Sequence, residues 1–585
     1  MAESVAAMDF DEILTQIGEF GLYQRVNYLL ICLPVLFAAA NSLSYAFTAG
    51  TPKYRCRIEQ CDDEDEDDEE QLAQYQTDWL DVAIPGTRDK HGYFTPSDSC
   101  LRFATNESEE FGVQQSATTC DASMFLPQHK PERCRQFVYD MSEHTIVQDW
   151  QLTCKENAWK LAFVGTTHFA GLVVGTALFG YLADRFGRKL IFVFCTIFMG
   201  LTGIGQALAW DYSSFLGFAL LNAVGTSGVY PLAFIIGVEM VGPRKREMTS
   251  IVLNYFYAVG EALLGLAAWL LTNWQALQLA LSIPPLFFVV YFWLVPESVR
   301  WLLARNEHEK AGTIIRKAAH VNQRELSLEL LASFKQQQLD TTDAKQSQQL
   351  QPEQRQIWPS VKQVFASNTL IWRYTNLLFI WAVNAIVFYG LSLNSTNLSG
   401  NKYLNFALVC LIEIPGYCLA WLCLRKLGRR LALSGSLMLC AITCAASGYL
   451  TTGANWLIVT LFLLGKLGIT SSFAVIYTYT AEMMPTVIRS GGVGVMSTFA
   501  RFGAMLAPFV PLLGSYYEPL PLLLFGVVSM LASILSLLLP ETFHKKLPDT
   551  VVEAIALGKE MEPVSVESAD SSTALGNNVQ HESII

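Results

Sequence analysis

The sequence predicts an all-α membrane protein whose twelve transmembrane helices form two halves of six. Hydrophobic residues make up 52% of the 585-residue chain and charged residues only 16%, whereas soluble proteins carry about 25% charged residues. About twelve apolar stretches follow one another, each about 20 residues long, which is the length a helix needs to cross the hydrocarbon core. The alternating pattern of an outer-membrane β-barrel is not seen in the sequence. These observations exclude disordered, collagen-like and ordinary soluble multidomain proteins.

The apolar stretches fall into two groups of six, separated by the polar segment 297–372. Residues 1–25 lack the basic n-region of a secretory signal, so the first stretch is expected to act as a signal anchor. Helix 1 is expected at 26–48, helices 2–6 within 159–296 and helices 7–12 within 373–540. The stretches after the first are 159–183, 190–210, 213–238, 248–272, 276–296, 373–394, 402–424, 431–450, 455–481, 491–515 and 519–540.

Lysine and arginine concentrate in alternate loops between these stretches. The loops after the second, fourth and eighth stretches are basic, whereas the loops between them are almost free of basic residues, with Lys402 as the main exception. Because cytosolic loops carry the excess of lysine and arginine, both termini are expected in the cytosol and residues 49–158 outside the cell. The basic residues are Arg185, Arg188, Lys189, Arg244, Lys245, Arg246, Arg425, Lys426, Arg429 and Arg430.

The segment 49–158 carries the signs of an extracellular loop. An even set of cysteines in an oxidising compartment predicts up to three disulfides, with fifteen pairings left open. A zinc site is less favoured because no Cys-x-x-Cys pair is present. Asn106 begins a glycosylation sequon in the same segment. The cysteines are Cys56, Cys61, Cys100, Cys120, Cys134 and Cys154.

Polar segments outside the apolar stretches complete the organisation. Residues 297–372 are expected to form two or three short cytosolic helices, and residues 541–585 a disordered cytosolic tail. The C-terminal residues Ser583 to Ile585 have the form that PDZ domains bind. An unbroken acidic run, Asp62 to Glu70, supplies most of the net charge of −12. It is either a solvated insertion or a region that attracts cations to the outer surface.

Two motifs repeat at matching places in the two halves. A glycine followed by basic residues comes after the second and the eighth stretches, at Gly187 and Gly428. A glutamate followed by an arginine comes after the fourth and the tenth stretches. Such repetition is typical of transporters built from parallel repeats.

These motifs resemble the major facilitator superfamily and, within it, the organic cation, carnitine and organic anion transporter family, which includes insect carnitine- and β-alanine-type transporters. The resemblance rests on the Cys-rich loop and on Trp150 to Cys154, Gly180 to Lys189, Pro296 to Leu303, Ala481 to Arg489 and Pro540 to Thr542. It implies a plasma-membrane transporter working by alternating access, with charge pairs that hold one state closed. The expected gating residues are Asp184, Arg185, Arg188, Glu239, Arg244, Arg425, Arg429, Glu482 and Arg489.

Five ionisable residues lie well inside the apolar stretches, away from their ends, where charge is costly and usually functional. They are His168, Glu261, Glu413, Lys466 and Arg501. In the family that the chain resembles, cation transporters carry an acid at the place of Arg501, and carnitine and anion transporters an arginine. An arginine that binds a carboxylate and a glutamate that binds an amine describe a site for a zwitterion such as β-alanine or carnitine. Alternatively, Arg501 or Lys466 neutralises Glu413.

Aromatic residues attract ammonium groups through cation–π contacts, although aromatics also simply pack helices. The resemblance places Trp381, Tyr257, Tyr230, Phe388, Phe473 and Tyr477 at the cavity. Glu261 and His168 are candidates for proton relay, and coupling to Na⁺ or H⁺ stays open. The expected partners are a small-molecule substrate and the lipid bilayer, with no nucleic acid. Because no Walker loop, metal motif or nucleophile elbow is found, the sequence predicts a transporter and not an enzyme, without a cofactor. A non-transporting sensor on the same scaffold is the second hypothesis.

Overall fold

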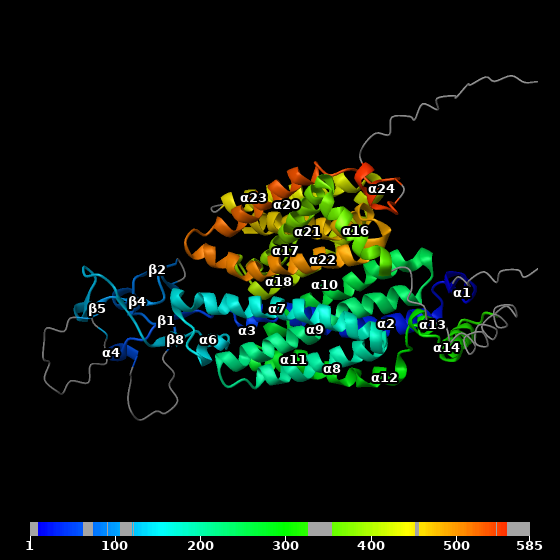
Figure 1. The fold of residues 1–585 in the computed structure, drawn as a ribbon. Coiled ribbons are helices and arrows are strands. Elements are labelled where there is room, and N and C mark those ends of the chain that lie inside the picture. The colour runs from blue at the N-terminus through cyan, green and yellow to red at the C-terminus, as the bar shows by residue number, and fades with distance from the viewer. Residues whose placement is uncertain are drawn as a thin grey trace, which may run out of the picture.

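The computed structural model consists of a long helical bundle with a Cys-rich lobe at one end (Figure 1). It describes residues 10–62, 74–89, 92–105, 120, 122–325, 354–450, 455–545 and 547–557. The sequon at Asn106, most of the acidic run and the C-terminal residues Ser583 to Ile585 lie outside the described residues.

Eleven helices in the described part of the chain are long and apolar enough to cross a membrane, and a twelfth, of 17 residues, is shorter. This confirms the predicted all-α membrane fold. In the N-half the spans are α2 (Leu22–Leu43) with α3 (Tyr45–Thr48), α7 (Cys154–Phe186), α8 (Arg188–Ala207), α9 (Tyr212–Met240), α10 (Arg246–Leu270), and α11 (Trp274–Leu286) with η3 (Phe287–Val290) and α12 (Tyr291–Leu294). In the C-half they are α17 (Asn368–Asn394), α18 (Lys402–Leu411) with α19 (Glu413–Lys426), α20 (Arg429–Tyr449), α21 (Asn455–Met483), α22 (Arg489–Leu506) with η7 (Ala507–Ser515), and α23 (Leu520–Ser536).

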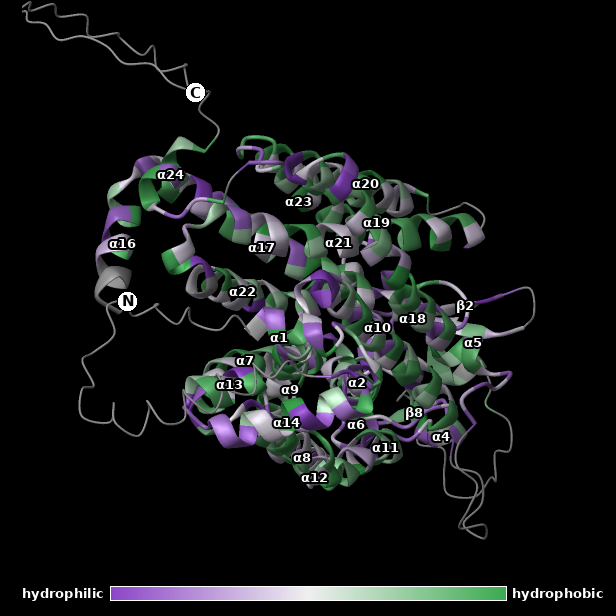
Figure 2. Cartoon of the chain, turned by 90° about the vertical axis from the view of Figure 1, so that its right-hand side faces the viewer, coloured by the Kyte–Doolittle hydropathy of each residue, from purple (hydrophilic) through white to green (hydrophobic). Residues whose placement is uncertain are grey.

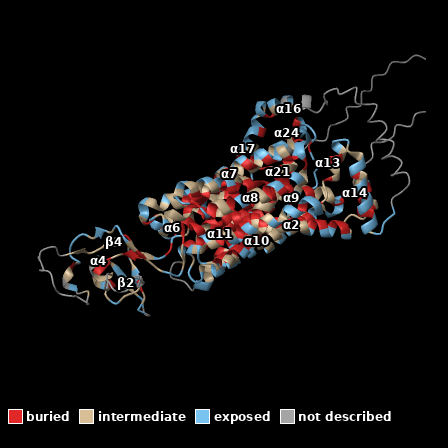
Figure 3. Ribbon diagram, turned by 90° about the horizontal axis from the view of Figure 1, so that it is seen from below, coloured by how far each residue is buried: buried red, intermediate tan, exposed pale blue. Residues whose placement is uncertain are grey.

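The two halves lie side by side and meet along two pairs of spans. The span α10 packs against α18 and α19, and the span α7 packs against α22 and η7. Apolar residues cover much of the outside of the bundle (Figure 2), and large exposed residues such as Leu178, Trp269 and Ile442 lie there. Such a surface suits hydrocarbon better than water. The buried residues are concentrated inside the bundle, whereas the lobe is largely exposed (Figure 3).

One span is interrupted at the position that matters most for the site. The helices α18 and α19 are separated at Ile412, and Glu413 is the first residue of α19. Pro415 explains the interruption, because proline has no backbone N–H and its ring clashes with the carbonyl four residues earlier, here that of Leu411. The break therefore places Glu413 at a helix start inside the membrane.

The Cys-rich lobe is built from four small antiparallel sheets, and its six cysteines form three disulfides. These join Cys56 to Cys134, Cys61 to Cys120, and Cys100 to Cys154, which settles the pairing that the sequence left open. A bidentate ion pair between Arg55 and Asp62, with a shortest distance of 2.8 Å, is almost fully buried in the lobe. The paired strands are β1 (Tyr54–Cys56) with β8 (Phe137–Tyr139), β2 (Gly86–Arg88) with β3 (Phe94–Pro96), β4 (Leu101–Arg102) with β7 (Glu132–Arg133), and β5 (Ala104–Thr105) with β6 (Phe125–Leu126).

Short helices gather at the end of the bundle opposite the lobe. In the expected loop 297–372 the described part contains α13 (Val299–Ala304), α14 (His308–Val321) and α16 (Gln354–Ala366). Before the first span, α1 (Phe10–Gln16) packs on α14, and Ile13, Leu14 and Ile17 are buried there. The loop 49–158 ends earlier than expected, because α7 already begins at Cys154.

The expectation of a disordered tail over 541–585 is wrong for its first part. A helix, α24 (Val551–Ala556), follows the last span, and its Val551 and Ala554 are buried against Val364 and Leu370. Arg373 of α17 donates hydrogen bonds to the carbonyl oxygens of Ala554 and Leu557. Apolar burial and these two bonds hold the segment, which its polar composition alone does not reveal.

Candidate functional site

A fully buried ion pair joins α19 to α21. Glu413 Oε1 lies 2.8 Å from Lys466 Nζ, and neither side chain has any exposed surface. The Lys466 ammonium also donates to Ser392 Oγ at 2.8 Å and to the Phe388 carbonyl at 3.2 Å. Its nitrogen lies 3.3 Å from the centre of the Phe388 ring. Of the alternatives that the sequence left open for Glu413, neutralisation by Lys466 is the one seen in this structure.

A second buried acid, Glu261, reaches this ion pair from the other half. It lies on α10 and is fully buried, and its carboxyl group is within interaction range of Glu413 and Cys410. Among the described residues, neither of its oxygens accepts a hydrogen bond and it makes no ion pair. Both oxygens of Glu413 also lack a hydrogen-bond partner among the described residues, but Glu413 has the ion pair with Lys466. Buried carboxylates are normally paired, so Glu261 is the acid of the site without a counter-charge.

The aromatic residues that the sequence proposed form two neighbouring groups. In the C-half, Trp381 lies edge-on to Tyr477 with ring centres 4.4 Å apart, and Phe473 contacts both rings and Phe388. In the N-half, Tyr230 and Tyr257 meet at 5.4 Å. The hydroxyl groups of Tyr230 and Tyr477 interact across the two halves. The structure therefore gathers all six aromatic side chains at one place.

Arg501 lies at the edge of this group and has no acidic partner among the described residues. It is partly buried, and its Nη1 donates to the carbonyl and the hydroxyl oxygens of Ser497, at 3.0 and 3.1 Å. The same hydroxyl lies 3.2 Å from the Tyr477 hydroxyl. Most of the Arg501 guanidinium is thus left available to an anionic group.

Tyr389, which sequence reasoning missed, connects the charges of the site. Its hydroxyl lies within electrostatic range of Glu261, Arg501, Tyr477 and Glu413. An aromatic in an apolar stretch gives no sign of which way it faces, so only the packing of α17 could reveal this residue. Tyr389 marks the point between the acid without a counter-charge and Arg501.

His168, on α7, is separated from Glu261 and Tyr389 by the side chain of Tyr45. Its ring packs against that of Tyr45 at 6.2 Å, and its Nε2 is buried without a hydrogen-bond partner. Tyr45 in turn interacts with Glu261 and Tyr389. The structure therefore places His168 next to the site but not in contact with Glu261.

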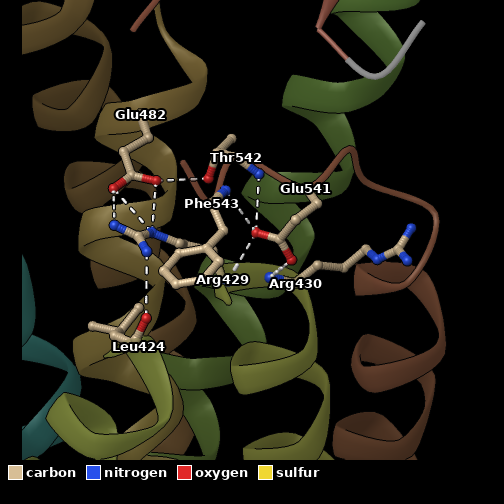
Figure 4. A network of polar contacts seen from close by, with 7 residues as sticks. All are labelled: Leu424, Arg429, Arg430, Glu482, Glu541, Thr542 and Phe543. Carbon is tan, nitrogen blue, oxygen red and sulfur yellow. Dashed lines mark hydrogen bonds and ion pairs between the residues drawn. The ribbon is translucent and has the colours of Figure 1, made fainter. Parts of the chain in front are cut away.

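A second charge cluster lies at the end of the bundle opposite the lobe, in the C-half (Figure 4). Arg429 binds Glu482 across 2.7 Å, and Thr542 donates to the same carboxylate at 2.6 Å. Glu541 accepts the backbone N–H groups of Arg429 and Arg430 at 2.9 and 3.0 Å. A carboxylate at a helix N-terminus satisfies free N–H groups and the helix dipole, so Glu541 fixes the start of α20.

The N-half repeats this cluster with different residues. Arg188 pairs with Asp184 and lies 3.6 Å from Glu239, which accepts a hydrogen bond from Ser298. Glu297 accepts the backbone N–H of Lys189 at 3.0 Å. Glu297 and Glu541 belong to the sequence motifs described above, but the sequence did not reveal that they cap helices. Each of them caps a helix start that lies more than a hundred positions away in the chain.

The repeated glycines have a direct physical reason. Gly187 and Gly428 precede α8 and α20 with φ values of +113° and +83°, which side-chain-bearing residues rarely adopt. A β-carbon at these glycines would lie 2.5 Å from an oxygen of Glu297 and 3.0 Å from one of Glu541. Glycine lets each carboxylate reach its helix start.

The remaining residues expected in gating lie outside the two clusters. Arg244 is 3.8 Å from Glu19, Arg425 stacks on Trp421, and Arg489 donates to the carbonyl of Met484. Arg185 contacts the Tyr181 hydroxyl. In the described part of the chain, the polar contacts of all nine expected gating residues stay inside their own half.

Comparison with known proteins decides the family. The Major Facilitator Superfamily profile matches residues 141–508. The chain is 33% identical to the Organic cation transporter protein of Drosophila melanogaster over 95% of this chain and 96% of that protein. It is 32% identical to the human Organic cation/carnitine transporter 2, over 93% of each chain. The chain belongs to the major facilitator superfamily and, within it, to the organic cation and carnitine transporter family.

Solved structures agree with this fold. The partially occluded inward-open xylose transporter XylE from E. coli matches 88% of this chain with a TM-score of 0.54 and 14% identity. A multi-pass membrane transporter, and not an enzyme, is therefore established for this member of the superfamily. No group of three or more His, Cys, Asp or Glu side chains within the described ranges is arranged to hold a metal ion.

The two capping glutamates of this transporter predict a difference in stability. Burial raises the pKa of Glu297. Burial also acts to raise the pKa of Glu541, but its backbone N–H donors outweigh this and lower it. We expect Glu541→Gln to cost about 1–2 kcal/mol, because charge-assisted hydrogen bonds are lost at a partly exposed site, and Glu297→Gln to cost less.

Thermal melting of the purified variants in detergent checks this expectation. A lowered folded-state pKa means that Glu541 stabilises the fold above its unfolded-state pKa, and that the benefit is lost as the pH falls through the folded-state value. The wild type and Glu541→Gln should therefore converge in melting temperature at acidic pH. Equal melting temperatures at pH 7 would contradict the capping role.

Proposed function

We propose that this protein is a secondary-active plasma-membrane transporter of small organic zwitterions or cations, of the β-alanine or carnitine type. One observation carries the proposal: Arg501 and Glu261 both lack an ionic partner among the described residues, and both lie within electrostatic range of the Tyr389 hydroxyl. A free guanidinium suits a carboxylate, and a free carboxylate among aromatic rings suits an ammonium group. A zwitterion satisfies both.

Glu413 takes a different part in this proposal from the one that the sequence favours. Its carboxylate is occupied by Lys466, so it acts on the substrate amine through its neighbour Glu261. The relatives named as organic cation and organic cation/carnitine transporters support an amine-bearing substrate. An organic anion satisfies only Arg501 and leaves Glu261 without a partner.

Alternating access is supported by where the halves touch. Near the lobe, Glu143 of the N-half forms an ion pair with Lys402 of the C-half, and Phe47 packs on Tyr403 and Phe406 with ring centres 5.5 and 5.0 Å apart. Lys402, the exception among the sparsely basic loops, thus joins the halves. Among the described residues, the two charge clusters at the other end form ion pairs only within their own halves.

We infer from this pattern that the structure resembles a state closed toward the lobe. The basic loops favour cytosolic termini and an extracellular lobe, which makes this state inward-facing. The two charge clusters are then the candidate gates that rearrange when the transporter turns outward. A PDZ-domain partner at the C-terminus stays a proposal on the sequence alone.

A substrate panel tests the proposed function. Uptake of labelled carnitine, β-alanine, a simple quaternary amine and a simple organic anion is measured in cells that express the wild type. We expect uptake of at least one zwitterion and weaker uptake of the quaternary amine. Uptake of the organic anion alone would contradict the proposal, and so would absence of uptake for all four compounds in cells whose surface expression is verified.

A further inference from the structure

We propose that Glu261 and Glu413 hold a single proton between them, and that the ammonium group of the substrate displaces this proton. The protein would then exchange its substrate for a proton. This inference rests on the proposed function for the identity of the substrate, but the proton-binding pair itself is argued from the contacts of the site.

Lys466 has no hydrogen-bonding capacity left for Glu261. An ammonium group carries three N–H donors. Three acceptors already surround Lys466 Nζ: Glu413 Oε1 at 2.8 Å, Ser392 Oγ at 2.8 Å and the Phe388 carbonyl at 3.2 Å. The lysine therefore balances the charge of one carboxylate, Glu413, but none of the four oxygens of Glu413 and Glu261 has a hydrogen-bond partner among the described residues.

Glu261 and Glu413 can serve each other only if one of them is protonated. The two carboxyl groups lie on helices that pack against each other and interact electrostatically. Two ionised carboxylates contain no donor, and no oxygen of either acid has a hydrogen-bond partner among the described residues. Two carboxylates and one ammonium also leave one negative charge in a fully buried site, which is costly. One proton supplies the missing donor and cancels the missing charge.

Among the described residues, the groups that act on Glu261 include no cation besides Lys466. The ionisable groups that interact with Glu261 are, besides Glu413 and Lys466, the thiol of Cys410 and the hydroxyls of four tyrosines, Tyr45, Tyr257, Tyr389 and Tyr417. These are neutral groups on α3, α10, α17, α18 and α19. No metal-binding cluster is found among the described residues. A proton fits the pair better than a metal ion does.

The exchange follows from charge balance. Glu261 or Glu413 loses its proton to water as the substrate ammonium binds, and the O–H···O⁻ bond is replaced by an ion pair between the new carboxylate and the substrate ammonium, with an N–H···O⁻ bond where the substrate is a primary amine. No covalent bond other than the carboxyl O–H breaks. Without a proton or an ammonium, two bare carboxylates face each other, and like charges that close repel.

The location of the pair makes this exchange relevant to transport. Glu261 belongs to α10 of the N-half, whereas Glu413 and Lys466 belong to α19 and α21 of the C-half. The proton thus bridges the two halves at the contact between α10 and α19. If α10 and α19 can pack together only when either a proton or the substrate ammonium lies between Glu261 and Glu413, the flux of protons is coupled to the flux of substrate.

Proton release on substrate binding is the test. Purified full-length transporter in weakly buffered detergent solution receives carnitine, β-alanine or a quaternary amine between pH 5.5 and 8.5. A pH-sensitive dye follows protons and calorimetry follows binding, with Na⁺ or K⁺ as the only metal ion. We expect one proton released per bound substrate over part of this range, equally in Na⁺ and K⁺. Glu261→Gln should bind substrate more weakly, and it should release no proton even at substrate concentrations that saturate it. The matched control is Glu247→Gln, an exposed acid at the start of the same helix, which should release protons like the wild type.

The outcomes separate this inference from the proposed function. Substrate binding without proton release at any pH overturns the proton pair alone, and so does binding that requires Na⁺. If no amine binds, the proposed function fails, and infrared spectroscopy still tests the pair: a protonated-carboxyl band in the wild type that Glu261→Gln loses and Glu247→Gln keeps supports it. A wild-type spectrum without that band overturns it.

Discussion

Replacing Arg501 by alanine is expected to weaken the transport of carboxylate-bearing amines strongly while sparing amines without a carboxylate. The guanidinium is held by Ser497 and has no acidic partner among the described residues, so removing it leaves no buried charge behind. A charge-assisted contact to a ligand carboxylate contributes at least about 2 kcal/mol, or about 30-fold in affinity. We therefore expect the KM for carnitine or β-alanine to rise by about that factor or more, measured by uptake in expressing cells.

Two comparisons make this experiment specific. Uptake of a simple quaternary amine by the same variant controls for expression and folding, and should stay near the wild-type value. Arg501→Lys keeps the charge but not the planar two-point geometry, so it should lie between the wild type and Arg501→Ala. Equal losses for all substrates would mean that Arg501 supports the fold and does not recognise a carboxylate.

Replacing Lys466 by methionine is expected to cause the largest loss of stability of any single change in the site. It removes the ammonium that pairs with Glu413 and leaves two buried acids without a cation among the described residues. Breaking a buried ion pair on one side costs about 3–5 kcal/mol. We expect a strongly reduced yield of folded protein and a lower melting temperature, measured by fluorescence-detected size exclusion after heating.

The double variant Glu413→Gln with Lys466→Met is the matched control. It removes both charges together, so it should recover most of the lost stability, as is common when buried pairs are replaced as a unit. Its transport should nevertheless stay low, since Glu261 loses its acidic neighbour. A single Lys466→Met variant as stable as the wild type would contradict the structural importance of the pair.

The bilayer explains why so much of the fold could be predicted. Each span needs about 20 apolar residues, and this requirement is visible in the sequence without any tertiary contact. The span boundaries were harder, because hydropathy detects only the apolar part of a helix. The helix α7 begins at Cys154 and includes Lys155, Glu156 and Asn157 before the apolar part.

The ionisable residues of the candidate site could be chosen from the sequence, but the pairs that they form could not. The cost of charge in a membrane singled out Glu261, Glu413, Lys466 and Arg501, and the structure brings all four close to Tyr389 or Lys466. Which acid pairs with which base depends on packing between distant helices. The capping role of Glu541 likewise depends on a loop that folds back on a helix start.

The disulfide between Cys100 and Cys154 ties the Cys-rich lobe to the N-half of the molecule. The lobe grows out of the first span and is bonded to the first residue of α7, so both of its anchors belong to the N-half. When the N-half tilts relative to the C-half, the whole lobe is expected to move with it. An antibody that binds the lobe alone would move with the N-half and leave the transport rate unchanged. An antibody that also binds the segment around Lys402 would link the two halves and slow transport.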